Sequence, residues 1–297
     1  MKNGHCLICD SNKYQKIAPL KYDYLKRFNT NFFLVKCLQC GFHYLSPLPG
    51  DDDLLEIYSD EYHFHEGKWL FSLFGWFFEL SLIKDASLIK KYKKRGTVLD
   101  IGGGSGNFLD QFGADWTRYY VDPSPSAVGT LNKDIKIFNK YLEECHFDNE
   151  LFDVIILRNV LEHTSNPGPL IKEVGRIMKK DGIFFIRVPN INSVDYKLFR
   201  EYWYVVQDPG HIAFYSPETI TKFMGNMDFN TLHLSTTTFS APLSLLRSYN
   251  FKRHGERSWL NKLHAPLILA LSFFYSLTSC FFSKGKGGEM KLICSKK

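Results

Sequence analysis

The sequence predicts an α/β protein with a mostly parallel sheet that is covered by helices on both faces. Three observations support this fold class. An apolar strand at residues 98–100 runs into a glycine-rich turn, a second strand at residues 119–121 is followed by Asp122, and residues 152–157 are almost entirely apolar. Apolar strands suit a sheet that is buried on both faces. A glycine-rich turn at the end of the first strand suits a bound cofactor.

Length and composition narrow the classes of protein that the chain can represent. Its 297 residues suffice for one large α/β domain and a smaller one. Hydrophobic residues at 44% and charged residues at 23% are typical of a globular protein and argue against disorder. A net charge of +6 fits nucleic acid, an anionic membrane or an ordinary solvated face. The first thirty residues lack the apolar segment of a signal peptide, so we expect a cytoplasmic protein with reduced thiols.

Two C-x-x-C pairs dominate the amino-terminal module, which we place at residues 1–50. Together they can supply four thiolates to one tetrahedral ion, which predicts a structural Zn site of the zinc-ribbon type. An apolar run at residues 31–35 is expected to be the strand that delivers the second pair. Disulfides and a redox dithiol are the alternatives, and His5 and His43 rank below the cysteines as ligands. The predicted ligands are Cys6, Cys9, Cys37 and Cys40.

Residues 51–95 are predicted to be a helical linker that covers the cofactor site. Residues 69–89 have the pattern of a helix with a wide apolar face. Tyr58, Tyr62 and His63 precede this helix, where they can form a lid or pack between modules.

Residues 96–297 form the main domain and begin with the loop GTVLDIGGGSG. The dinucleotide fingerprint G-x-G-x-x-G fails in this loop, because Asn107 stands where the third glycine is required. A phosphate-binding loop fails as well, since no Gly-Lys-Ser/Thr follows. What remains is a turn with glycines at 102, 104 and 106 after Asp100, an acid that suits a cationic ligand. Asp122, about twenty residues on, is placed to bind ribose hydroxyls.

VLDIGGGSG, VDPSPSAV and FDVIILRNVLEH together resemble the class I S-adenosylmethionine-dependent methyltransferases. The resemblance implies a Rossmann-like seven-stranded sheet and S-adenosylmethionine as the cofactor. It also implies that Leu142 packs on the adenine, with Glu143 or Glu144 near the amino group. The predicted cofactor-binding residues are Asp100, Gly102, Gly104, Gly106, Asp122, Leu142 and Asn159.

Three residues are predicted to carry the chemistry of methyl transfer. In-line displacement at a sulfonium requires an aligned acceptor and often a base of near-neutral pKa. His163 follows the fourth strand and is our first candidate for that base, with Glu162 as its orienter. His211, in a loop before a helix capped by Ser216, is the second candidate. A purely structural role is the alternative for each histidine.

The remaining elements of the domain follow from local pattern. Helices are expected at residues 107–112, in a segment that ends at 179, and at 217–224, and another is expected to begin at Ser124 and Pro125. Strands are expected at 135–138, 182–190, 231–238 and 290–294, and the family resemblance makes the last an antiparallel edge strand. The aromatic residues of 202–204 are candidates for the wall of a sugar-like pocket or for surface positions.

An insertion at residues 240–288 separates the last two strands. Its segment 265–282 contains no charged residue, is close to the lower length limit of a membrane span, and has cations on both sides. We expect it to contact an anionic membrane surface without crossing, because the last strand must return to the sheet. A core helix or a dimer contact is the alternative.

The sequence therefore favours a methyltransferase that acts on a small or glycan-type acceptor. The run from Cys37 to His63 resembles segments that join a zinc-binding module to the methyltransferase domain in enzymes of sugar and surface-polysaccharide pathways. If the insertion binds membranes, a lipid-linked saccharide becomes the favoured acceptor. An RNA methyltransferase that uses the ribbon for binding is a rival, although no base-stacking module accompanies the basic residues. A non-catalytic interaction protein on the same fold is another.

Overall fold

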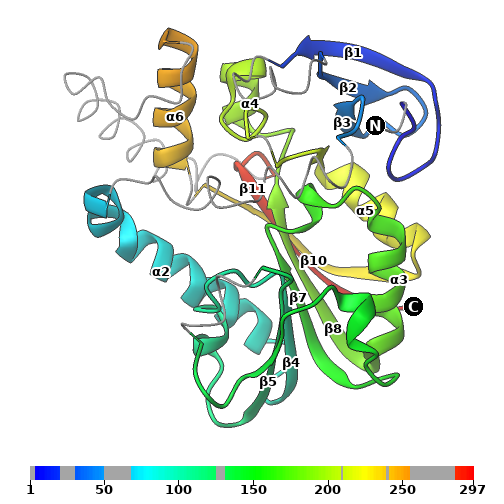
Figure 1. Ribbon diagram of the computed structural model, residues 1–297, viewed down its shortest axis with the longest axis vertical. Coiled ribbons are helices and arrows are strands. Elements are labelled where there is room, and N and C mark those ends of the chain that lie inside the picture. Colours follow the sequence, from blue (N-terminus) through cyan, green and yellow to red (C-terminus); the bar gives the residue numbers. More distant parts are fainter. Residues whose placement is uncertain are drawn as a thin grey trace.

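The computed structural model describes residues 4–20, 31–49, 68–124, 131–208, 210–238, 241–254 and 285–297, and it contains a seven-stranded and a four-stranded sheet (Figure 1). The α-helices are α2 (Lys68–Lys90), α3 (Pro167–Ile177), α4 (Val194–Phe199), α5 (Pro217–Asn226) and α6 (Ala241–His254). The predicted lid residues Tyr58, Tyr62 and His63, the helix start at Pro125 and the apolar segment 265–282 lie outside the described residues.

The seven-stranded sheet has the order β10-β11-β8-β7-β4-β5-β6. Its strands are β4 (Gly96–Ile101), β5 (Trp116–Val121), β6 (Lys136–Phe138), β7 (Phe152–Arg158), β8 (Met178–Pro189), β10 (Phe229–Thr237) and β11 (Glu289–Lys296). β11 pairs antiparallel with both β8 and β10. The predicted antiparallel direction of the last strand is therefore correct, but its predicted edge position is wrong. β10 is the edge strand, because β11 inserts between it and β8.

Alternate residues of the central strand β7 face two separate hydrophobic clusters. Ile155 and Leu157 belong to the cluster that contains the apolar side of α3. Val154 and Ile156 belong to the cluster that contains Leu82 and other residues of α2. Both faces of β7 are thus buried, which explains why its sequence shows no polar alternation.

The helix predicted at residues 107–112 is wrong. The structure has only the 3₁₀ turn η2 (Leu109–Gln111), and Phe112 already has an extended backbone. Gly106, with φ +71°, holds the chain in the glycine turn immediately before this segment, and Gly113 follows it. Too few residues remain between them to repay the nucleation of an α-helix. Phe108 and Phe112 are instead buried against the sheet.

The four-stranded sheet combines the amino-terminal module with a strand from the main domain. Its order is β1 (Tyr14–Pro19), β2 (Phe33–Cys37), β3 (His43–Ser46) and β9 (Ala213–Phe214). β3 and β9 pair antiparallel, and the Leu45 N–H donates to the Ile212 carbonyl at 3.0 Å. The sheet therefore crosses the module boundary predicted at residue 50.

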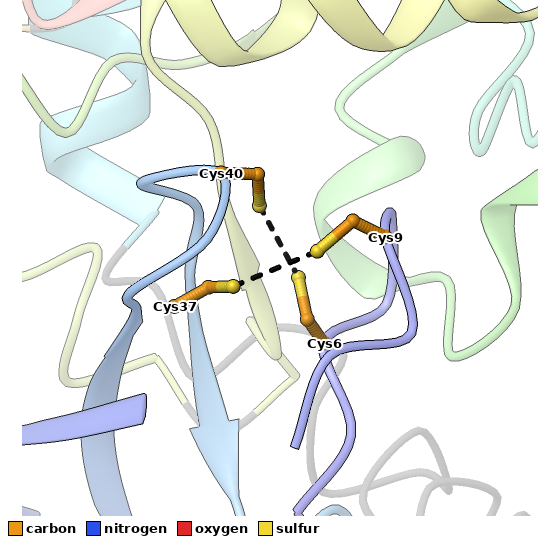
Figure 2. A group of neighbouring side chains, drawn as sticks. All are labelled: Cys6, Cys9, Cys37 and Cys40. Carbon is orange, nitrogen blue, oxygen red and sulfur yellow. Dashed lines mark hydrogen bonds between the residues drawn. The ribbon is translucent and has the colours of Figure 1, made fainter. Parts of the chain in front are cut away.

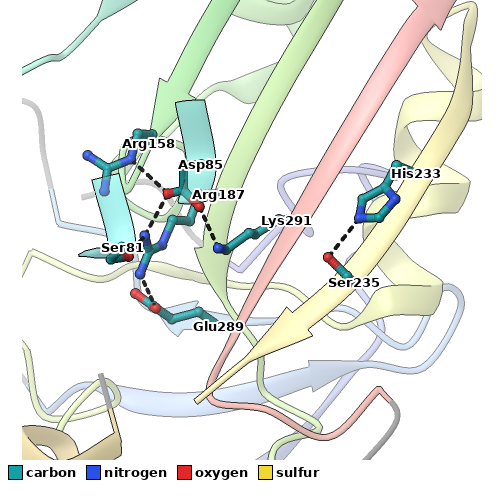
Figure 3. Close-up of polar contacts among 8 residues, drawn as sticks. All are labelled: Ser81, Asp85, Arg158, Arg187, His233, Ser235, Glu289 and Lys291. Carbon is teal, nitrogen blue, oxygen red and sulfur yellow. Dashed lines mark hydrogen bonds and ion pairs between the residues drawn. The ribbon is translucent and has the colours of Figure 1, made fainter. Parts of the chain in front are cut away.

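α2 covers a buried ionic network on one face of the large sheet (Figure 3). Asp85, fully buried, accepts from the guanidinium groups of Arg187 at 2.7 Å and Arg158 at 3.3 Å, and it also pairs with Lys291. Arg187 pairs in addition with Glu289. Sequence analysis did not find this network, because its members come from α2, β7, β8 and β11 and have no common spacing.

α6 packs against the segment formed by α4 and the 3₁₀ turn η6 (Arg200–Tyr202). The Trp203 indole N–H donates to Ser244 Oγ at 3.2 Å, and the Tyr204 backbone N–H donates to Ser248 Oγ at 2.8 Å. Trp203 is 1% exposed, so it is a core residue rather than a surface aromatic. In the described part of the chain, no helix has both the length and the apolar run that a bilayer crossing requires.

Candidate functional site

Two side chains hold the glycine loop at the end of β4 in shape. One is Tyr120 of β5 and the other is Asp122, the residue that follows β5. The Gly104 N–H donates to Asp122 Oδ2 at 3.0 Å, and the Tyr120 hydroxyl donates to the Gly104 carbonyl at 2.6 Å. Gly102, Gly104 and Gly106 all have positive φ, which L residues rarely adopt. A Cβ at Gly104 would meet nothing within 4 Å, so this glycine borders open space rather than packing. The loop therefore offers a bare backbone surface to a ligand.

Asp100 lies beneath this loop as a buried carboxyl group. It is 1% exposed, and its Oδ1 has no hydrogen-bond partner among the described residues. Burial raises the pKa of Asp100 to about 7; Arg158 acts in the lowering direction, and Asp122 adds to the rise. A cationic group placed near Asp100 would reverse this balance. The prediction that Asp100 suits a cationic ligand thus has a physical basis in its burial.

The carboxyl end of β7 lies directly against the glycine loop. A Cβ built on Gly102 would come within 2.6 Å of Val160 Cγ2, so only glycine allows this contact. Asn159, the residue before Val160, has φ +53°, and its backbone N–H donates to the Arg187 carbonyl at 2.8 Å. A non-glycine residue in this conformation is uncommon and is often found at functional sites. The turn after β7 therefore faces the cofactor loop closely enough to share one ligand site.

Glu162, His163 and His211 come together at this same turn. The first two belong to the 3₁₀ turn η5 (Leu161–His163), and a backbone bond from Ile212 N–H to the Glu162 carbonyl holds the loop of His211 beside them. The two imidazole rings have centroids 4.6 Å apart. Burial raises the pKa of Glu162 well above its ordinary value. Burial, together with the neighbouring His211, lowers the pKa of His163 to about 3. The predicted catalytic residues are thus adjacent, with Glu162 and His211 buried and His163 half-buried.

The four predicted zinc ligands also converge, as Figure 2 shows. The Sγ atoms of Cys6 and Cys40 lie 3.5 Å apart, and those of Cys9 and Cys37 lie 3.6 Å apart. A tetrahedral site with Zn–S bonds of about 2.3 Å has sulfur-to-sulfur edges of about 3.8 Å, so these separations fit. All four are free thiols rather than disulfides.

Each cysteine pair is built as the same turn. The Asp10 N–H donates to the Cys6 carbonyl and the Gly41 N–H to the Cys37 carbonyl, and both donors have positive φ. Burial acts to raise the pKa of the Cys6 and Cys37 thiols, and backbone N–H groups two and three residues on, which point at each sulfur, act to lower it. The residues present therefore fit a zinc ion.

The two flanking histidines are not part of this cluster. His5 hydrogen bonds through Nδ1 to Asp10 and its side chain is 57% exposed. His43 is half-buried on β3, and the burial of its ring lowers its pKa to about 4. Both observations agree with ranking the cysteines first.

The family follows from a match that covers the parallel strands of the seven-stranded sheet and most of β10. A family model described as a methyltransferase domain matches residues 80–234, slightly more than half of the chain. The chain belongs to this family. It is an S-adenosylmethionine-dependent methyltransferase whose acceptor the family does not specify.

Curated relatives of this methyltransferase are about a quarter identical to it over the aligned residues. An uncharacterized protein of Methanocaldococcus jannaschii is 26% identical over 55% of this chain and 80% of its own length. A ubiquinone biosynthesis O-methyltransferase of Glaesserella parasuis is 26% identical over 40% of this chain and 48% of its own. An uncharacterized methyltransferase of Bacillus subtilis is 28% identical over 44% of this chain and 50% of its own. The chain thus spans about half the length of the latter two.

Solved structures show the same fold. A SAM-dependent methyltransferase of Thermotoga maritima superposes with a TM-score of 0.54 at 18% identity, over 82% of this chain and 98% of that one. The 1,6-didemethyltoxoflavin N1-methyltransferase of Burkholderia thailandensis was solved with bound 1,6-didemethyltoxoflavin and S-adenosylhomocysteine. It superposes with a TM-score of 0.52 at 13% identity, over 88% of this chain and 96% of that one. These likenesses establish the class I fold.

The methyltransferase brings most of its predicted site residues to one edge of the sheet. The glycine loop, Asp122, Asn159 and the η5 turn all follow the carboxyl ends of parallel strands, where ligands bind in such sheets. Leu142, 3% exposed, lies in the 3₁₀ turn η4 (Leu142–Cys145), the turn after β6. Tyr120 was not among the predicted site residues, although it lies two residues before Asp122 and residues at that spacing in an extended chain share a face.

Proposed function

We propose that this methyltransferase acts on a small or glycan-type acceptor held over the carboxyl ends of β4 and β7. The observation that carries the proposal is the contact between the cofactor loop after β4 and the turn after β7. Val160 packs on Gly102 of the cofactor loop, and two residues later Glu162 begins the polar, buried group with His163 and His211. Polar groups in a water-shielded site suit an acceptor that carries hydroxyl groups.

His163 and His211 are proposed to act as a group with Glu162 rather than as independent bases. The low pKa of His163 keeps its ring neutral at physiological pH but makes it a weak proton acceptor by itself. We expect His163→Ala to lower turnover by about 10² to 10⁴ and to leave S-adenosylmethionine affinity nearly unchanged. His211→Ala is the matched comparison, because it removes the second ring from the same cluster. Two variants with unaltered turnover would exclude both residues from catalysis.

The amino-terminal module is proposed to be a structural zinc ribbon that supports the acceptor side of the site. Its strand β3 pairs with β9, which begins two residues after His211.

We also propose that the acceptor is a lipid-linked saccharide at the cytoplasmic face of a membrane. The resemblance of the linker region to enzymes of sugar pathways and the apolar segment at 265–282 support it.

A transfer assay with methyl-labelled cofactor tests this function. Soluble and lipid fractions of a cell extract are incubated with the full chain, and we expect label to appear in a glycan-containing fraction. Gly104→Val should abolish transfer, because a branched side chain in the left-handed region is strained and fills the open space at the loop. Gly113→Val is the control, since this glycine also has open surroundings but lacks positive φ. Label confined to RNA or protein would refute the proposed acceptor class.

A further inference from the structure

Glu162, His163 and His211 form a compact set of metal-binding side chains. One carboxylate oxygen and one nitrogen of each ring lie within 4.8 Å of one another. The three come from two chain segments that a backbone hydrogen bond joins, from Ile212 N–H to the Glu162 carbonyl at 2.9 Å. The backbone of the fold therefore holds the three side chains close together.

The Glu162 carboxyl group lacks the partners that its burial requires. The residue is 1% exposed, and neither carboxylate oxygen has a hydrogen-bond partner among the described residues. A buried carboxylate without such partners is costly, and buried charges in proteins are usually paired or bound to metals. Both oxygens of Glu162 are thus acceptors that a cation could satisfy.

The two histidines are oriented as metal-bound histidines usually are. Nδ1 of His163 donates to the Gly210 carbonyl and Nδ1 of His211 to the Val205 carbonyl, each at 2.8 Å. Because a carbonyl can only accept, these bonds fix the tautomer and place the lone pair of each ring on Nε2. Metal-ligating histidines nearly always donate their other ring N–H to a carbonyl or carboxylate, which sets the ring orientation.

We propose that Glu162, His163 and His211 bind one divalent cation of the Mn²⁺, Fe²⁺ or Zn²⁺ class beside the cofactor loop. Two imidazoles and one carboxylate suit these ions, and the absence of thiolates separates this site chemically from the four-cysteine cluster. Three protein ligands leave coordination positions open for an oxygen of the acceptor. This would be a second metal site with a role distinct from that of the zinc ribbon.

The proposal rests on the proposed function and names its substrate class as a hydroxyl compound. The acceptor hydroxyl binds the cation, which lowers the pKa of the hydroxyl, and its proton leaves to solvent. The oxygen lone pair then forms the new O–CH₃ bond. The S–CH₃ bond of S-adenosylmethionine breaks at the same time, its electron pair remains on sulfur, and S-adenosylhomocysteine is released. The site thereby predicts O-methylation.

Titration of the full chain with Mn²⁺, followed by electron paramagnetic resonance, tests the site directly. Mn²⁺ is the probe because it favours oxygen and nitrogen ligands over thiolates, so the cysteine cluster does not compete. We expect one bound Mn²⁺ per chain. Glu162→Gln and His211→Gln should each weaken binding by at least about 100-fold, since loss of even an outer-shell partner costs 10- to 100-fold. His233→Gln is the control, because this histidine lies on β10 and bonds only locally to Ser235 Oγ at 2.8 Å.

Calorimetry with S-adenosylmethionine on the same samples separates this proposal from the proposed function. Cofactor binding without Mn²⁺ binding at millimolar metal, or Mn²⁺ binding that both variants retain, would overturn the metal site and leave the methyltransferase intact. Absence of cofactor binding would instead refute the proposed function. If Glu162→Gln protein has the melting temperature of the parent and no longer binds Mn²⁺, the metal site is supported. The same result for His211→Gln supports it through a second ligand.

Discussion

At the residue scale, the electrostatics of the cofactor loop depend on Asp100. Its pKa of about 7 lies above the ordinary value of 3.8, so the folded protein binds a proton that the unfolded chain releases. The stability of the cofactor-free protein therefore falls as pH rises from about 4 to about 7 and levels off above that range. A bound cation, such as the sulfonium or the amino group of S-adenosylmethionine, favours the charged carboxylate and lowers this pKa again.

We expect S-adenosylmethionine affinity to rise with pH through about 7 and then to become constant. Below pH 7 most of the cofactor-free protein carries a neutral Asp100, and binding must release its proton, which costs up to tenfold in affinity per pH unit. Arg158 and Asp122 are the charged groups that act on Asp100. Calorimetry between pH 5.5 and 8.5, about 1.5 units to either side of 7, measures the curve. Asp100→Asn should give a weaker and flatter profile, whereas an unchanged profile in that variant would assign the titration to another group.

Residue positions were predictable where they follow a strand end. Asp100, Asp122 and Glu162 each terminate or follow an apolar run, and parallel strands bring such ends together. Burial was not predictable in the same way. Nothing local in the sequence shows that Glu162 lacks hydrogen-bond partners in the described part of the chain or that His163 loses its basicity, because both depend on the loop of His211 and the strand β9 that follows it.

At the scale of elements, the amino-terminal module and the main domain are joined by backbone hydrogen bonds. β3 lies between β2 and β9, so the strand that follows His211 is paired to the module that contains the four-cysteine cluster. Structural zinc contributes folding free energy directly. Loss of the ion should therefore weaken both the module and the support for the His211 loop.

We expect elemental analysis to find one zinc per chain, and chelation to melt the amino-terminal module before the main sheet. Differential scanning calorimetry with and without chelator measures the separation of the two transitions. Cys37→Ser should reproduce the effect of chelation, because it removes one of four ligands. Cys145→Ser should not, since this thiol lies outside the cluster and donates only to the Tyr141 carbonyl. Protein that is purified under reducing conditions without any metal, yet melts in one transition, would contradict a zinc ribbon.

The contact between α2 and the sheet depends on charge as well as on apolar packing. The pKa of Asp85 is lowered although burial acts to raise it, because Arg187, Lys291 and Arg158 surround the carboxylate. Its stabilising contribution is therefore present above pH 3.8 and is lost as pH falls through the still lower pKa of the folded state.

We expect Asp85→Asn to lower the free energy of unfolding by about 3 to 5 kcal/mol, because it leaves three buried or half-buried cations with one remaining acid, Glu289. Urea denaturation at neutral pH measures the change. Asp181→Asn is the matched control, since Asp181 pairs with Lys93 while its side chain is 77% exposed, and such pairs contribute about 0 to 1 kcal/mol. Equal effects of the two substitutions would show that the network under α2 is energetically neutral.

At the scale of the whole molecule, the periodicity of the sequence predicted the positions of helices and strands better than it predicted which of them lie next to one another. Most predicted strands and the long helix α2 were found close to their expected positions, since buried strands and apolar helix faces leave local patterns. Strand order is a tertiary property, and for that reason the edge position of the last strand was wrong. The pairing of β9 with the four-stranded sheet could not be predicted either, because a strand of two residues, Ala213 and Phe214, is too short to show a periodic pattern.

The insertion between β10 and β11 remains a prediction of membrane contact. α6 lies in its described part and is joined to Trp203, the residue after η6, by the hydrogen bond to Ser244; the chain re-enters the sheet as β11 between β8 and β10. Both ends of the insertion therefore attach to the same domain, and a single bilayer crossing by residues 265–282 is incompatible with that connection. A segment that lies in the interface is compatible with it, and the flanking cations would contact anionic headgroups.

Flotation with lipid vesicles measures this contact. We expect the full chain to float with vesicles that contain anionic lipid and to remain at the bottom of the gradient with purely zwitterionic vesicles. Raising the salt concentration should weaken flotation, because attraction between exposed charges is screened within about 10 Å at 0.1 M salt. A variant in which a short glycine-serine linker replaces residues 255–284 keeps α6 and β11 and should not float. Full-length protein that stays at the bottom with anionic vesicles would instead assign the apolar segment to the core or to a contact between two copies of the chain.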